Sequence, residues 1–378
     1  MKNGCGSRRP WCYPIGIMRL PYFCALYLAV VLPGFAQTAA NAGPPLPTDP
    51  RAIFEAAAPF YDFTSPELKP WHLKATYQLY DEKGKFSEQG TYEYWWASPQ
   101  VYRSTWTRPG ATHTEWHMEN GTHAYESTGE PINLFEYSLH TALLSPLPRH
   151  ADLDPAKFRL EDEGVIANRS EGHCITIVPI MNQDEFTGHP ANGPFPTYCF
   201  EPQRPVLQSV FSFEQVLTQY SDVVTTQSKY LARNVNISEG KHKLITARVD
   251  SIDQIEACDL TFTPPSSVTS TYVGKTGLIS SNTIKINKEI MASLMIKKVQ
   301  PIYPMEVKKA HVQGKVVVVA TIGTDGKTYD LRVISAPSAS LADSAFKAIS
   351  QWEYKPYLLN GEPVPVETTV VVTYALGK

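Results

Sequence analysis

Few side chains in this sequence have the types and spacing that a catalytic site requires. A phosphate-binding loop needs the pattern Gly-x4-Gly-Lys-Ser/Thr, because its backbone amides and its lysine surround the phosphates. The stretch Gly323–Thr328 ends in Gly-Lys-Thr but has Thr321 where the first glycine must stand, and Gly274–Thr276 fails in the same way at Thr269. The Gly-x-Ser-x-Gly turn of serine hydrolases does not occur. These patterns predict no catalytic residues and no cofactor.

Two histidines have the spacing of a zinc site. On a helix, His113 and His117 would lie on one face and could both bind the metal. The following Asn120-Gly121 pair is typical of a β-hairpin, so we expect a strand here, and the motif HExxH is absent. Polar surface histidines are therefore the favoured interpretation, and no metal site is predicted. The acidic run Glu161–Glu163 likewise favours a solvated turn over catalytic carboxylates, so nothing predicts an enzyme.

The cysteines indicate an oxidising compartment. Cys174 and Cys199 lie in two short apolar runs, and the Gly/Pro/Asn-rich chain between them can reverse direction. We expect the two strands to pair and to carry a disulfide, which would stabilise the fold by roughly 3 kcal/mol on the chain-entropy estimate. Cys5, Cys12 and Cys24 lie within residues 1–42 and would be removed with a signal peptide, so Cys258 would be left over. No CxxC motif exists, so neither a zinc nor a thioredoxin-like site is predicted.

Residues 1–42 predict a signal peptide. Arg19 precedes an apolar run from Tyr22 to Leu32, which suits a signal-peptide core but is shorter than the roughly 20 residues of a membrane-spanning helix. Ala40-Asn41-Ala42 then has the small-x-small pattern of a cleavage site. We expect an exported protein of the periplasm or cell envelope. It would be anchored in the inner membrane if the apolar segment is not cleaved.

The composition favours a folded protein rich in strands and turns. Of 378 residues, 43% are hydrophobic and 19% charged, which is enough apolar mass for real cores. The 31 prolines, 20 tyrosines and 7 tryptophans favour strands and turns over a helical bundle. A net charge of −3 argues against nucleic acid as a partner. The length indicates two or three domains.

Residues 43–263 have the pattern of an antiparallel β domain. Short runs such as His72–Tyr80 and Gly90–Trp96 alternate with turns, and residues 131–147 form the one helical segment able to lie across the sheet. Several tryptophans fall between Trp71 and Trp116. They are consistent either with an ordinary core or with a curved sheet that lines an apolar cavity.

A composition change separates this region from a second domain. The Ser/Thr-rich residues 264–295 predict a linker, and residues 296–378 predict the order strand, strand, helix, strand. Ser340 with Asp343 is expected to cap the helix. One helix on a small sheet leaves an edge strand exposed, and an exposed edge can accept a strand from a partner.

Residues Ile296 to Leu376 resemble the C-terminal domain of TonB, the energy transducer of Gram-negative envelopes. Gln300–Pro304 matches the family's Gln-Pro-x-Tyr-Pro segment, and Asp325-Gly326 and Trp352-x-Tyr354-x-Pro356 follow in the family's order and spacing. The expected fold class is α+β, with a half-barrel-like antiparallel middle domain followed by a small ββαβ TonB-like domain.

The resemblance implies binding to outer-membrane TonB-dependent receptors, in support of energy-coupled transport across the outer membrane. Gln300 and Tyr303 map to contacts with the receptor plug. Glu306 stands where the best-known members have arginine, which puts that contact in doubt. The last strand maps to pairing with the receptor's short N-terminal box peptide, through Val370, Val371, Val372, Thr373 and Tyr374.

The sequence departs from a full transducer before this domain. Such a transducer has an uncleaved N-terminal helix with a histidine face that engages ExbB and ExbD, followed by a long spacer. Here the apolar segment contains no histidine, and the β domain replaces the spacer. The β domain resembles the LolA-like half-barrel carriers of lipids and lipoproteins.

Two hypotheses of different class follow. The first is an envelope protein that binds receptors, with ExbB and ExbD as further partners if the N-terminal segment is uncleaved. The second is a periplasmic carrier that holds an acyl chain in the middle domain and uses the TonB-like domain as a docking tail.

Overall fold

The computed structural model describes residues 46–148, 153–156, 158–165, 173–180, 195–212, 216–256, 259–268, 271–273 and 284–376. The predicted signal peptide and Cys258 lie outside these residues. The chain from Pro44 to Lys378 forms one unit in which the middle and C-terminal parts contact each other. In the described part of the chain, no helix is both long enough and apolar enough to cross a membrane.

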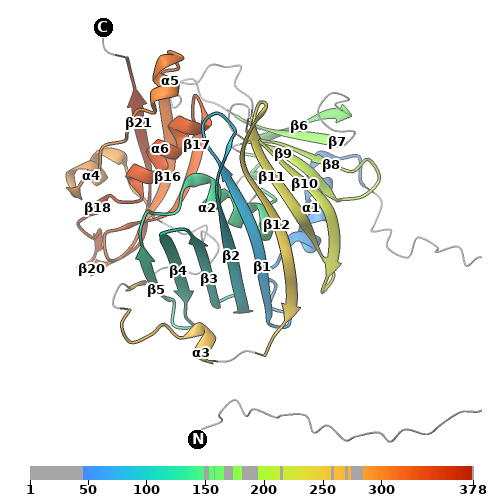
Figure 1. Ribbon diagram of the computed structural model, residues 1–378, viewed down its shortest axis with the longest axis horizontal. Coiled ribbons are helices and arrows are strands. Elements are labelled where there is room, and N and C mark those ends of the chain that lie inside the picture. The colour runs from blue at the N-terminus through green and yellow to red at the C-terminus, as the bar shows by residue number, and fades with distance from the viewer. Residues whose placement is uncertain are drawn as a thin grey trace, which may run out of the picture. The chain divides into compact units, whose positions relative to one another are not determined.

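One large sheet with antiparallel pairing throughout dominates the middle part (Figure 1). Its strand order is β13-β5-β4-β3-β2-β1-β12-β11-β10-β9-β8-β7-β6, and no pairing among the described residues joins β13 to β6, so the sheet is not closed into a barrel. The predicted turns lie where expected, with Asp81–Gly84 between β1 and β2 and Asn120-Gly121 between β4 and β5. The strands are β1 (Trp71–Tyr80), β2 (Phe86–Ser98), β3 (Val101–Arg108), β4 (Ala111–His117), β5 (Thr122–Thr128), β6 (Phe158–Val165), β7 (His173–Pro179), β8 (Thr197–Phe200), β9 (Leu207–Phe211), β10 (Val216–Thr226), β11 (Lys229–Glu239), β12 (His242–Gln254) and β13 (Thr271–Val273).

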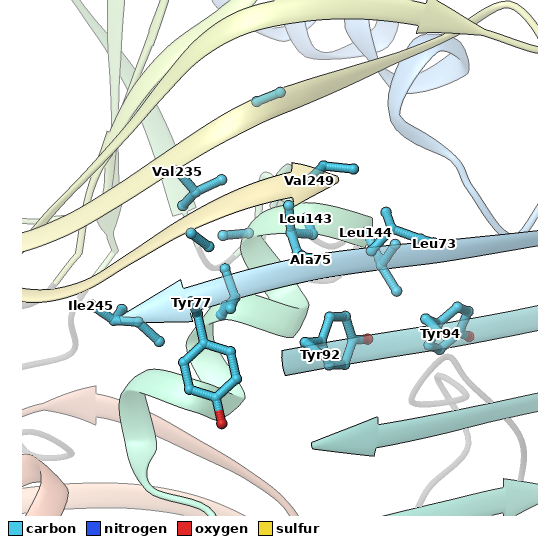
Figure 2. Packing of buried hydrophobic residues seen from close by; sticks show 14 of the residues in the cluster. Leu73, Ala75, Tyr77, Tyr92, Tyr94, Leu143, Leu144, Val235, Ile245 and Val249 are labelled. Atoms are coloured by element: carbon cyan, nitrogen blue, oxygen red, sulfur yellow. The ribbon is translucent and has the colours of Figure 1, made fainter. Parts of the chain in front are cut away.

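Helix α2 (Leu134–Leu144) covers one face of this sheet, within the segment for which a helix was predicted. Alternate residues of β1 are buried, as expected for a strand with one face in the core. Figure 2 shows Leu143 and Leu144 of α2 among side chains of β1, β2, β11 and β12. Leu139 is also fully buried in this cluster. Of the two interpretations that the sequence allowed for this face, an ordinary core and an apolar cavity, the packing of α2 supports the ordinary core.

A second cluster lies where helix α1 (Pro50–Tyr61) packs on β7 to β9. Ile53, Phe54 and Ala57 of α1 are buried against Ile175 and Phe200. This cluster surrounds the paired strands that carry the two cysteines.

The C-terminal part has a sheet of order β14-β21-β16-β17 with helix α6 packed on one face. Alternate valines of β16, together with Ala345 and Ile349 of α6, are buried between the sheet and the helix. A short helix, α3, precedes this part. The elements are α3 (Asp259–Phe262), β14 (Ile284–Lys285), α4 (Lys288–Ser293), β15 (Met295–Lys297), α5 (Met305–Lys309), β16 (Gly314–Ile322), β17 (Thr328–Ser335), α6 (Ala339–Ile349), β18 (Glu353–Tyr354), β19 (Leu358–Leu359), β20 (Glu362–Pro363) and β21 (Val366–Tyr374).

Two details differ from the sequence-based expectation. The stretch 264–295, expected as a linker, contributes β13 to the large sheet and β14 to the small one, and its Met291 is buried in the C-terminal core. The cap of α6 is Ser338, whose hydroxyl accepts a hydrogen bond from the Leu341 amide, so Ser340 lies inside the helix. Asp343 consequently does not complete a capping box with Ser340.

Candidate functional site

The outer edge of β21 is the candidate site, and the strand's own pattern positions it. Val370, Val372 and Tyr374 are buried against the α6 side of the sheet, whereas Thr369, Val371 and Thr373 are exposed on the opposite face. Such alternation fixes the register, because a slip by one residue would turn the buried valines to solvent.

The two edges of β21 are paired very differently. β16 pairs with β21 along its whole length, from Gly314 opposite Tyr374 to Ile322 opposite Val366. On the other edge, β14 pairs in parallel with Val366 and Glu367 alone, and the Ile286 amide donates to the Glu367 carbonyl at 2.9 Å. Beyond Glu367, no strand of the described residues pairs with this outer edge.

The hydrogen bond at Glu367 shows which backbone groups face outward. In a strand, the N–H and C=O of one residue point to the same side and those of the next residue to the other side. Because the Glu367 carbonyl faces β14, the groups of Thr369, Val371 and Thr373 also face outward. Of the residues predicted to pair with a partner, Val371 and Thr373 have outward groups, whereas Val370, Val372 and Tyr374 face β16. Thr369 was missed by the prediction.

Buried aromatic residues fix the segment that contains Gln300 and Tyr303. The Trp352 indole N–H donates to the Val299 carbonyl at 2.7 Å, and Lys298 lies 5.4 Å from the Trp352 ring. The Tyr303 hydroxyl donates to the Val312 carbonyl at 2.6 Å.

Tyr303 also links this segment to the end of β21, since its ring packs edge-on against Tyr374 with a centroid distance of 5.3 Å. Its hydroxyl is therefore used internally. Gln300 is exposed, and so is Ile302, at 80% of its surface. The structure thus brings Tyr303 to β21 and leaves Gln300 available on the same segment.

The predicted cysteine pair lies in neighbouring strands of the large sheet. Cys174 of β7 is opposite Cys199 of β8, and their sulfur atoms are 2.00 Å apart in a disulfide. Both residues are fully buried. They lie beside the α1 cluster, in a different part of the chain from the β21 edge.

The aromatic face of the middle part is a packed core. Trp71, Trp96 and Trp106 are each at most 4% exposed. Trp116 is equally buried but lies on the opposite face of the sheet, beside Arg103. A cavity lined by residues that include Tyr61, Leu143 and Tyr220 has a volume of about 10 Å³. That volume could hold about one water molecule and is far too small for an acyl chain.

The two histidines with zinc-like spacing lie on one face of β4, together with Glu115. His113 Nε2 lies 2.8 Å from Glu115 Oε1, and His117 Nε2 lies 3.7 Å from Glu115 Oε2. Burial alone would raise the pKa of Glu115, but hydrogen bonds from His113 and His117 outweigh burial and hold it well below its usual range. Among the described residues, no group of three or more His, Cys, Asp or Glu side chains could hold a metal ion.

More histidines lie under the same face. His117 is 7% exposed, stacks on Tyr102 at 3.8 Å and lies 3.8 Å from the His123 ring. Burial, together with the neighbouring His117, lowers the pKa of His123 to about 3. Burial likewise lowers the pKa of His140, which bonds Tyr92 at 2.6 Å, to about 4. His117 is thus a buried core residue and His113 is partly buried, so neither is the polar surface residue that the sequence favoured.

Comparison with known proteins confirms the resemblance of the C-terminal residues to the TonB family. The family described as "Gram-negative bacterial TonB protein C-terminal" matches residues 299–376. Protein TonB of Vibrio cholerae serotype O1 is 28% identical over 113 residues, which is 30% of this chain and 43% of that protein. The chain therefore spans less than half the length of this relative.

Solved structures are similar to parts of this chain. The solution structure of the Pseudomonas aeruginosa TonB C-terminal domain has 26% identity and a TM-score of 0.21, covering 22% of this chain and 86% of that one. A LolA superfamily protein from Nitrosomonas europaea has 9% identity and a TM-score of 0.34, covering 58% of this chain and 99% of that one.

Proposed function

We propose that this chain is an exported cell-envelope protein whose C-terminal domain binds TonB-dependent receptors of the outer membrane by strand addition at β21. The observation that carries the proposal is the outer edge of β21, which presents three residues with outward backbone groups inside the segment that matches the TonB family. Backbone hydrogen bonds supply affinity for an extended peptide, and alternate side chains supply specificity. The receptor's box peptide is the proposed added strand.

We further propose that Gln300 contacts the receptor plug, because it is exposed on a segment that Trp352 and Tyr303 hold against the C-terminal core. The proposed organisation is a signal peptide over residues 1–42, an aromatic-rich β domain over 43–263, a Ser/Thr-rich linker over 264–295 and a TonB-like domain over 296–378. The domain at 296–378 is proposed to be the ββαβ module, and that at 43–263 the half-barrel. Engagement of ExbB and ExbD, and hence energy coupling, is proposed only for a chain that keeps its N-terminal apolar segment.

Replacing Val371 with proline tests the strand addition. Proline removes the outward N–H of Val371 but no bond to β16, so the domain should stay folded. We expect the affinity for a receptor box peptide to fall at least tenfold, which is about 1.4 kcal/mol. Val371→Ala is the matched control, because it keeps the N–H and shortens the same exposed side chain. Glu367 is unsuitable as a control, since its carboxylate pairs with Arg332 at 3.2 Å and with Lys285 at 3.6 Å.

Gln300→Ala separates the plug contact from the strand pairing. This variant should weaken binding to an intact receptor and leave binding of the isolated peptide unchanged. A folded Val371→Pro variant that binds the peptide as well as Val371→Ala would refute pairing at this edge.

The alternative function, a periplasmic lipid or lipoprotein carrier, would require a rearrangement of the middle domain. Leu139, Leu143 and Leu144 of α2 occupy the face on which an acyl chain would lie. Carriage would thus need α2 to leave the sheet.

A further inference from the structure

Helices α2 and α6 each begin with an amide that their own cap residue does not satisfy. The Asn133 side chain accepts hydrogen bonds from the Phe135 and Glu136 amides, both at 2.9 Å, at the start of α2. At the start of α6, the Ser338 hydroxyl accepts from the Leu341 amide and not from the Ala339 amide. The first amides of the two helices therefore need other partners, since helix starts leave several N–H groups without intrahelical acceptors.

Each of these two amides is satisfied by a carboxylate from the other domain. Asp343, on α6, accepts from the Leu134 amide at the start of α2, at 3.0 Å. Glu239, the last residue of β11, accepts from the Ala339 amide at the start of α6, at 2.7 Å. A negative charge at a helix N-terminus is also favourable to the helix dipole. The caps are reciprocal, so separating the domains would leave both helix starts unsatisfied.

Leu134 and Ala339, whose amides are capped in this way, also place their side chains in the core of the other domain. Leu134 belongs to the α2 helix but is buried in the C-terminal cluster, at 4% exposure. Ala339 belongs to α6 but is fully buried in the middle-domain cluster. Each domain thus completes its core with the first helical residue of the other.

Further polar and aromatic contacts join the two domains around Leu134 and Ala339. The Tyr137 hydroxyl donates to Asp330 at 3.0 Å, and the Tyr137 ring lies 5.6 Å from that of Phe346. The Lys327 ammonium donates to the Tyr125 hydroxyl and lies 5.0 Å from its ring. The contacts of the C-terminal domain come from β17, its preceding turn and α6. None of them involves the outer edge of β21 or Gln300.

We propose that the middle domain is a rigid docking platform for the C-terminal domain, and that the two stay docked while a partner strand is bound at β21. The binding of a partner strand at β21 rests on the proposed function, whereas the docking of the two domains is independent of it. A displacement applied to one domain would then be passed directly to the other, without a flexible joint between them.

Hydrogen exchange on the full chain tests the docking, because each cap lies in one domain and protects an amide in the other. Asp343→Ala should speed exchange at the Leu134 amide at least tenfold, and Glu239→Ala should do the same at the Ala339 amide. Glu362→Ala is the matched control, since Glu362 is an exposed carboxylate of the C-terminal domain that takes part in none of the contacts named above. Asp343→Asn and Glu239→Gln keep an acceptor and should accelerate exchange less, which separates loss of the cap from loss of the fold.

The second arm adds a receptor box peptide to the unmodified chain. The Leu134 and Ala339 amides should keep their protection within twofold when the peptide is bound. Acceleration on binding would show that the domains separate, and unchanged exchange in the two alanine variants would show that they are not docked; either result overturns the proposal. A peptide that fails to bind defeats the proposed function, while the first arm still decides the docking.

Discussion

Acidification should destabilise the fold through the histidines that are buried under the β4 face. His123 and His140 have folded-state pKa values of about 3 and about 4, compared with an ordinary value near 6.5. A histidine with a depressed folded pKa contributes stability that is fully present above about pH 6.5. That contribution is lost as the pH falls toward the folded pKa, because only the unfolded chain takes up the proton.

The magnitude follows from these values. Between pH 7 and pH 5, each histidine becomes almost fully protonated in the unfolded chain and stays neutral in the folded one. Each then lowers the free energy of unfolding by about 2 kcal/mol, and the two together by about 4 kcal/mol. This is a large share of the 5–15 kcal/mol that stabilises a typical protein.

Urea unfolding at pH 7 and pH 5 would measure the effect. The double variant His123→Asn/His140→Asn removes both ionisations and should lose about 4 kcal/mol less than the unmodified chain over this interval. Carboxylates with depressed pKa values, such as Glu115, act in both proteins and cancel in the comparison. His242→Asn, at an exposed position, is the control for the substitution itself. An unmodified chain that is equally stable at both pH values, or a double variant with the same pH dependence, would refute the assignment.

Two further predictions concern the middle domain. Cys174 and Cys199 should resist thiol labelling in protein isolated from the periplasm unless it is first reduced, whereas Cys258 should label directly; labelling of Cys174 or Cys199 without reduction would contradict the bridge. Because α2 fills the aromatic face, added fatty acid or lysolipid should leave the intrinsic tryptophan fluorescence unchanged up to millimolar concentration, and a saturable shift would support the carrier function.

The sequence predicted elements whose signals are local. The alternation in β1 and β16, the Asn-Gly turn after β4 and the apolar helix at α2 each depend on residues that are close in the chain. The pairing of Cys174 with Cys199 follows from the same logic, since two adjacent strands with a reversal between them bring their cysteines opposite each other.

Properties that depend on distant contacts were not predictable. The direction of the amides at the β21 edge follows from the hydrogen bond between the Ile286 amide and the Glu367 carbonyl. Ile286 belongs to the stretch 264–295, for which the composition predicts a linker. Whether the aromatic face encloses a cavity depends on how closely α2 packs against it. Amino-acid composition alone does not predict side-chain packing. The buried positions of His117 and His123 likewise depend on which elements cover β4 and β5.

Asp343 shows most directly why local rules fail at the domain boundary. Its spacing from Ser340 predicts a capping box, yet Ser338 caps the helix and Asp343 bonds the amide of Leu134, 209 residues away. Every residue except proline has the same backbone N–H, so the residue type does not indicate where that N–H donates. No sequence pattern therefore marks Leu134 or Ala339 as capped from the other domain. A C-terminal domain excised at residue 296 would keep Asp343 but lose Glu239, and the space that Leu134 fills in its core would be empty. Receptor binding measured on such a fragment would therefore report on an incompletely capped and incompletely packed domain, and the full chain is the proper reference for the affinity of the β21 edge.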